Sequence, residues 1–141
     1  MFKNCINFKD LDVTYFTTNE TNNMAGMFYG CFSLKSLNLK NFDTKKVINM
    51  SYLFFEGYAI YEIILDNFDT SNVIDMKYMF ADCVTFYNCF LLTKINITNI
   101  DISQTTDMSF MFTRCSKITS LDVSKFDTSK VVNISGMFSD C

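Results

Sequence analysis

Six cysteines are the residues of this chain whose chemistry could most readily build a site, because thiolates bind metals and form disulfides. Zinc sites use close pairs such as Cys-x-x-Cys, and the sequence contains neither such a pair nor a His. We interpret the cysteines as buried thiols that pack as small hydrophobes, with disulfides as the alternative and Cys83 and Cys89 as the pair best placed for one. Five of them recur at one position of a repeat: Cys5, Cys31, Cys89, Cys115 and Cys141.

Aspartates form a second column, in which each residue is followed by Thr or Ser side chains. Asx turns or helix N-caps are the interpretation that we favour, because Asp oxygens accept hydrogen bonds from nearby backbone N–H groups. A chain of calcium ligands is the alternative, but one carboxylate per repeat supplies few converging oxygens. The sequence therefore predicts no metal site and no cofactor. The column consists of Asp43, Asp69, Asp101 and Asp127.

These columns exist because the chain repeats with a period of 26 residues, as from Cys5 to Cys31. Residues 1–141 are expected to form a single repeat array, with units that start near residues 5, 31, 57, 89 and 115. About six additional residues, near 83–88, interrupt the period. Since apolar columns run to both termini, we expect a fragment of a longer array, with end-to-end self-association or docking to further repeats.

One unit is expected to contain a short strand, a polar turn and a short helix. Leu37 and Leu39 alternate with polar residues, which predicts a strand with one buried face. Val47, Met50 and Leu53 recur at helical spacing. The predicted fold class is therefore α/β: a leucine-rich-repeat-like solenoid of five strand–turn–short-helix units with one parallel sheet face.

Composition excludes several functions. The net charge of −3 and the scattered Lys and Arg residues argue against nucleic-acid binding. No apolar stretch is long enough for insertion into a membrane, and no signal peptide is recognisable. With no His and only four Gly, the sequence offers neither a catalytic triad nor a phosphate loop. We therefore expect a protein that is not an enzyme.

The outward side of the predicted sheet is one candidate binding surface for a protein or another macromolecule. Ile64 is unusual there, because polar residues hold its column in the other units. The alternative is a solvated polar face without a partner. The candidate residues are Asp10, Asp12, Ser36, Asn38, Lys40, Glu62, Ile64, Asp66, Lys94, Asn96 and Asp122.

The insertion is the second candidate, since insertions in repeat proteins map to loops that often lie on the binding side. Phe86, Tyr87 and Phe90 lie on or beside it, and exposed aromatic residues are typical of binding hot spots. The alternative, weighted equally, is that Phe86 fills the core in place of a neighbouring Leu.

Two segments carry a family resemblance. Residues 121–141 have the sequence LDVSKFDTSKVVNISGMFSDC, and residues 64–83 have the sequence ILDNFDTSNVIDMKYMFADC. Both resemble the repeats of BspA-like leucine-rich-repeat surface proteins, including those of Mycoplasma-type lipoproteins. The chain departs from ordinary leucine-rich repeats by placing aromatic or aliphatic residues where those have an Asn ladder: Phe16, Phe42, Phe68, Ile100 and Phe126.

The resemblance implies display on a cell surface and a non-catalytic role in adhesion or protein–protein recognition. It supplies no catalytic residues. The alternative hypothesis is a structural spacer within a longer repeat array or filament-like assembly. A spacer needs no unusual outward residues, whereas a binding module should expose an aromatic or apolar patch.

Overall fold

Two three-residue strands are the regular secondary structure of the computed structural model, which describes residues 1–60, 62–65, 67–83 and 96–141. Strand β1 spans Ser36–Asn38 and strand β2 spans Glu62–Ile64. The strands pair in parallel, with Leu37 opposite Ile63. The prediction of alternating burial is confirmed in β1, where Leu37 is buried between half-buried Ser36 and exposed Asn38.

The predicted α/β solenoid of five strand–turn–helix units is wrong, because the described residues contain no helix and only these two strands. The segment that we expected to be helical forms successive turns instead. The N–H groups of Met50 and Tyr52 donate to Asp75 and Lys77 in the next repeat, both at 2.9 Å. An α-helix would pair these groups with carbonyls four residues earlier in the same segment. Within the described residues, the structure therefore contains no helix that could cross a membrane.

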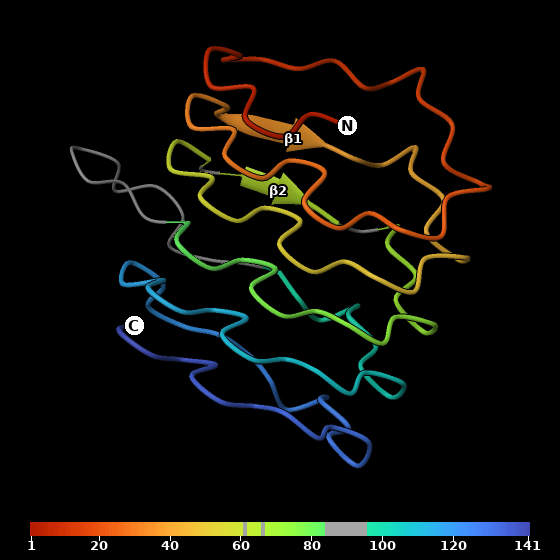
Figure 1. Cartoon of the computed structure of the whole chain (residues 1–141), viewed down its shortest axis with the longest axis vertical. Coiled ribbons are helices and arrows are strands. Elements are labelled where there is room, and N and C mark those ends of the chain that lie inside the picture. The colour runs from red at the N-terminus through yellow and green to blue at the C-terminus, as the bar shows by residue number, and fades with distance from the viewer. Residues whose placement is uncertain (61, 66, 84–95) are drawn as a thin grey trace.

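The repeats stack as coils, where a coil is the stretch of chain from one residue of the cysteine column to the next. Isolated parallel bridges join the coils at one column: Asn23 to Asn49, Asn49 to Asp75, Asp75 to Asp107, and Asp107 to Asn133. Figure 1 shows the coils following one another along the long axis, from the red N-terminal coil to the blue C-terminal coil. Hydrogen bonds between coils thus replace the hydrogen bonds that helices would have made.

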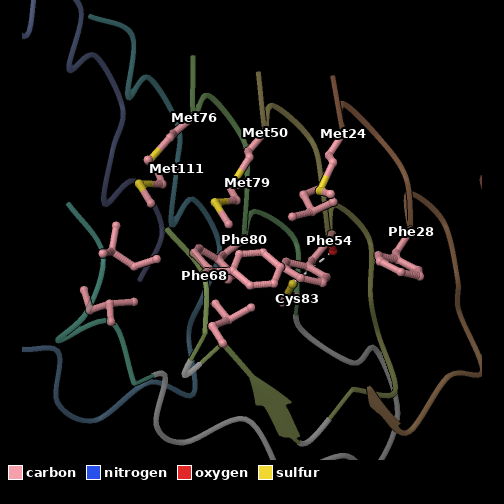
Figure 2. Packing of buried hydrophobic residues seen from close by; sticks show 14 of the residues in the cluster. Met24, Phe28, Met50, Phe54, Phe68, Met76, Met79, Phe80, Cys83 and Met111 are labelled. Carbon is pink, nitrogen blue, oxygen red and sulfur yellow. Dashed lines mark hydrogen bonds between the residues drawn. The ribbon is translucent and has the colours of Figure 1, made fainter. Parts of the chain in front are cut away.

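The core lies inside the stack and consists of methionine and phenylalanine columns. Phe28, Phe54 and Phe80 are fully buried and lie side by side, with ring centroids 5.9 Å and 5.6 Å apart (Figure 2). Their planes are within 17° of parallel, so each ring covers a face of the next. Methionines form a neighbouring row, in which Met24 and Met50 are buried as the sequence predicts (Figure 2).

A threonine column, two residues after the position of Phe42 and Phe68, joins the backbone of neighbouring coils. Thr44 is 1 % exposed, and its hydroxyl donates to the Asp69 carbonyl of the next coil at 2.9 Å. The Asp69 N–H donates back to the same hydroxyl at 2.8 Å. Thr70 repeats both bonds with Asp101, at 2.9 Å and 2.7 Å. Thr44 and Thr70 therefore each satisfy a backbone carbonyl and a backbone N–H at once.

Candidate functional site

Among the described residues, sheet-face candidates lie opposite one another at the two strands. Ser36 lies opposite Glu62, and Asn38 lies opposite Ile64, which is half-buried. Asp66 and Lys94 fall outside the described residues, as do Phe86, Tyr87 and Phe90 of the insertion. The binding role of both surfaces therefore stays a prediction. Asp10, Asp12, Lys40, Asn96 and Asp122 are exposed.

Four of these candidates share a local structural task. The Asp12 carboxylate accepts the Thr14 N–H at 2.9 Å, and the Asn38 amide oxygen accepts the Lys40 N–H at 3.1 Å. Asn96 and Asp122 make equivalent bonds two residues ahead, at 3.2 Å and 2.9 Å. The hydrogen bonds from Thr14 lower the pKa of the Asp12 carboxyl. Such Asx turns stabilise local bends of the chain, so these side chains need no ligand to explain them.

The aspartate column also forms Asx turns, which belong to the interpretation that the sequence favoured over calcium ligands. Asp69 accepts the Ser71 N–H at 3.0 Å and the Ser71 hydroxyl at 2.6 Å. Asp43, Asp101 and Asp127 accept the N–H two residues ahead in the same way. No helix follows them within the described residues, so they are turn residues rather than helix caps. Within the same residues, no cluster of acidic, Cys or His side chains could hold a metal ion.

The cysteine column is a ladder of thiols that donate to the preceding coil. The thiols of Cys31 and Cys83 are buried and donate to the carbonyls of Phe2 and Phe54, at 3.1 Å and 3.2 Å. Burial raises the pKa of the Cys83 thiol to about 12, which keeps it protonated and unreactive. Cys83 thus holds the column position that the sequence analysis gave to Cys89, which lies outside the described residues. Cys115 makes the equivalent bond to Phe80 at 3.2 Å.

The surface feature that the sequence analysis missed is a set of half-buried rings on the turns, which we call the aromatic stripe: Tyr29, Tyr52, Phe55, Tyr78 and Phe110. Tyr52 and Tyr78 stack with centroids 4.9 Å apart, and Tyr78 and Phe110 stack at 4.8 Å. Tyr29 stacks on Phe55 at 5.1 Å. Phe55 meets Tyr52 and Tyr78 edge to face, which joins the two rows into one surface.

Three rings of the stripe stand on backbone that favours glycine. Tyr52, Tyr78 and Phe110 have φ values of 57°, 55° and 56°. A bulky residue in this left-handed region is an outlier, and it costs roughly 1–3 kcal/mol. Aromatic stacking offsets part of that cost, at about 0.5–1.5 kcal/mol per pair. Gly26 and Gly136 occupy the same repeat position as these rings, with φ values of 59° and 62°. The alignment of glycine with bulky residues at one repeat position is the sequence signal that indicates this backbone conformation.

Charged groups border the stripe. The Lys3 ammonium lies 4.4 Å from the centre of the Tyr29 ring, in a cation–π contact. Burial, and next the nearby Glu56 carboxylate, raises the pKa of the Tyr29 phenol, so the ring stays neutral. Arg114 lies 3.4 Å from the Asp82 carboxylate on the same turns. The arrangement therefore combines partly exposed rings with positive and negative charges, a combination that suits the binding of a partner.

Comparison with known proteins identifies the class of the chain. The family model described as "Mycoplasma protein of unknown function, DUF285" matches residues 1–89 and, in a second match, residues 65–141. The two matches together span the chain, which therefore belongs to this family of Mycoplasma-associated proteins. The Mycoplasma-type part of the sequence resemblance is thereby confirmed. Neither a curated protein nor a solved structure gives a significant match.

Proposed function

We propose that this chain is a non-catalytic recognition module that binds a protein partner at a cell surface, in the manner of BspA-like surface proteins. The observation that carries the proposal is the aromatic stripe. Tyrosine and phenylalanine are enriched in the cores of protein interfaces, where they supply much of the binding energy. The stripe presents five such side chains, half-buried and held by one another, on one row of turns.

The backbone under the stripe supports a binding role over a purely architectural one. Glycine would occupy the column of Tyr52 without strain, as it does at Gly26. Left-handed backbone also recurs at a second column, which contains Asn4, Glu56 and Asp82, so what distinguishes the stripe is the placement of bulky aromatic residues on such backbone. Stacked rings also have little side-chain entropy left to lose when a partner covers them.

A structural spacer is the second candidate, and one observation favours it. The buried phenylalanine rings stack from coil to coil, with Phe80 and Phe112 5.5 Å apart and Phe112 and Phe138 5.7 Å apart. A spacer needs this stacking of coils and makes no use of the stripe, so the two functions make different demands on the surface.

Adhesion of beads coated with the purified chain, to cultured epithelial cells and to a panel of purified extracellular proteins, tests the proposal. The variant Tyr52→Ser/Tyr78→Ser removes the centre of the stripe. Its matched control is Ile48→Ser/Ile74→Ser, which changes two residues of the same coils that are 49 % and 47 % exposed. We expect the stripe variant to lose at least about tenfold in adhesion, since hot-spot residues cost about 2 kcal/mol or more.

The control variant is expected to retain adhesion. Equal adhesion of the stripe variant and the native chain would refute the role of the stripe. A third variant, Ser36→Ala/Asn38→Ala, separates the surfaces: loss confined to this variant would assign recognition to the strand face. Urea unfolding midpoints that match the native chain exclude misfolding as the cause of a loss.

A further inference from the structure

The second column of left-handed turn residues carries charged side chains next to the aromatic stripe. Glu56, Asp82 and Arg114 occupy this position in successive coils, with φ values of 58°, 53° and 56°. Their backbones join the coils, since the Glu56 N–H donates to the Ala81 carbonyl at 3.2 Å and the Asp82 N–H donates to the Thr113 carbonyl at 2.9 Å. Coils paired in this way lie about 4.8 Å apart, so side chains at one position are neighbours.

Asp82 shows how the chain itself satisfies a carboxylate at this position. Arg114, one coil further on, lies 3.4 Å from the Asp82 carboxylate and 3.7 Å from the carboxylate of Asp140. Glu56 differs, because none of the ion pairs among the described residues includes it. Its neighbours at the same position are Asp82, which has the same charge, and Gly30, which has no side chain.

Aromatic rings border the half-buried Glu56 carboxylate. The Tyr58 hydroxyl donates to it, and the Tyr58 ring stacks on Phe32 with the centroids 5.0 Å apart. Phe55, the residue before Glu56, stacks on Tyr29 at 5.1 Å. Burial, followed by the charges of nearby carboxylates, raises the pKa of the Tyr58 phenol, which keeps its hydroxyl protonated. A carboxylate has about four acceptor positions, so one phenol leaves most of them open.

A guanidinium group matches this combination of a carboxylate and rings. An Arg side chain donates two parallel hydrogen bonds to a carboxylate, and its plane and stem pack against aromatic rings. The chain already contains each half of such a contact. Arg114 pairs with Asp82, and the Lys3 ammonium lies 4.4 Å from the centre of the Tyr29 ring. A quaternary ammonium head group would also contact the rings, but it has no hydrogen to donate to the carboxylate.

We propose that Glu56, together with the rings of Phe55 and Tyr58, is the position at which the protein binds an arginine side chain of its partner. This inference rests on the proposed recognition function and names the partner chemistry: an exposed Arg flanked by apolar residues. The guanidinium pairs with the Glu56 carboxylate as Arg114 pairs with Asp82. The apolar residues on either side of the arginine cover the neighbouring rings.

Titration of the chain with the blocked peptide acetyl-Leu-Arg-Leu-amide, followed by the backbone amide signals of residues 55, 56 and 58 in NMR spectra, tests the position. We expect a Kd on the order of 1–10 mM, as one ion pair and a small apolar contact provide to a short peptide. The matched peptide carries citrulline in place of arginine, which keeps the shape of the side chain and removes its charge. It should bind about threefold to tenfold more weakly.

The variant Glu56→Gln removes the charge and keeps the size of the side chain. It should weaken binding of the arginine peptide about threefold to tenfold and leave binding of the citrulline peptide within about twofold. Glu20→Gln is the matched control, because it makes the same change at a different repeat position, where Glu20 pairs with Lys46 at 2.8 Å. This control should change the binding of neither peptide.

Two variants of Tyr58 isolate the contribution of the ring. Tyr58→Phe keeps the ring and loses only the phenol, so it should bind the arginine peptide within about twofold of the native chain. Tyr58→Leu removes the ring and should bind about twofold to fivefold more weakly than Tyr58→Phe, the loss expected for one cation–π contact at an exposed site. Urea unfolding midpoints that match the native chain exclude misfolding as the cause of a loss.

Arginine binding that survives Glu56→Gln, equal binding of the two peptides, or no saturable binding of the arginine peptide would overturn the assignment of Glu56. Adhesion that still depends on Tyr52 and Tyr78 would then leave the recognition function standing with a different partner chemistry. Binding of phosphatidylcholine vesicles that Glu56→Gln abolishes, in place of peptide binding, would assign the position to a lipid head group and refute the arginine proposal.

Discussion

The threonine column gives a prediction whose size follows from the hydrogen bonds of one hydroxyl. Replacement of Thr44 by Val keeps the branched shape of a side chain that is 1 % exposed. It removes the bond donated to the Asp69 carbonyl at 2.9 Å and the bond received from the Asp69 N–H at 2.8 Å. Both backbone groups then lie against a methyl group, partly shielded from water.

The expected loss in the free energy of unfolding is about 2–3 kcal/mol. Each hydrogen bond contributes about 0.5–1.5 kcal/mol, and an orphaned shielded group costs roughly 1–3 kcal/mol. Thr18 provides a graded comparison, because its hydroxyl donates only one bond, to the Asp43 carbonyl at 2.9 Å. Thr18→Val should therefore cost about half as much. Thr128 is exposed, and Thr128→Val should remain within about 0.5 kcal/mol of the native chain.

Urea unfolding followed by tyrosine fluorescence measures these differences, since the chain has 7 Tyr and no Trp. The slope of the free energy against urea must stay constant across the series for the comparison to hold. A cost for Thr44→Val below about 0.5 kcal/mol, equal to that of Thr128→Val, would refute the reasoning. It would mean that water replaces both hydrogen bonds without loss.

Two further predictions concern the core. Burial raises the pKa of Cys83 from 9.0 to about 12, so the stability that its thiol contributes is complete below pH 9 and falls as the pH rises from 9 towards 12. Cys83→Ala should flatten that part of the stability–pH curve, and an unchanged slope would contradict the assignment. Phe54 is fully buried and Phe138 is 49 % exposed, so Phe54→Ala should cost about 3–5 kcal/mol in urea unfolding and Phe138→Ala well under half of that. Similar losses at the two positions would argue against a stacked core.

The buried columns could be predicted from the sequence, whereas the backbone conformation that carries them could not. Val47, Met50 and Leu53 recur at spacings that an amphipathic helix produces, and all three are indeed buried. Successive turns produce the same spacing, because the turn bond from the Leu53 N–H to the Met50 carbonyl spans three residues. Hydrophobic periodicity reports which side chains face the core, and it does not report where their N–H groups point. Here the N–H groups of Met50, Tyr52 and Phe54 donate to the next coil, which no window of one repeat can reveal.

The sequence did not reveal the local structural role of the outward polar residues, for a related reason. Polar outward residues such as Asp12 and Asn38 suggested a ligand surface, but their oxygens fold back onto the chain in Asx turns. The aromatic stripe left a weaker trace in the sequence. Gly26 and Gly136 align with Tyr52, and a glycine in a repeat column indicates backbone that other residues adopt only at a cost.

The buried phenylalanine rings stack with equal closeness over connections of unequal length. Phe54 and Phe80 lie 5.6 Å apart, and Phe80 and Phe112 lie 5.5 Å apart. Cys83 and Phe54, which are joined by a thiol hydrogen bond, are 29 residues apart in the sequence. Cys115 and Phe80, which are joined in the same way, are 35 residues apart. The stack therefore keeps the spacing of its rings across a level with six additional residues of chain. For protein engineering, this means that a level of the stack can take additional residues between its rings without a change in the spacing of the rings.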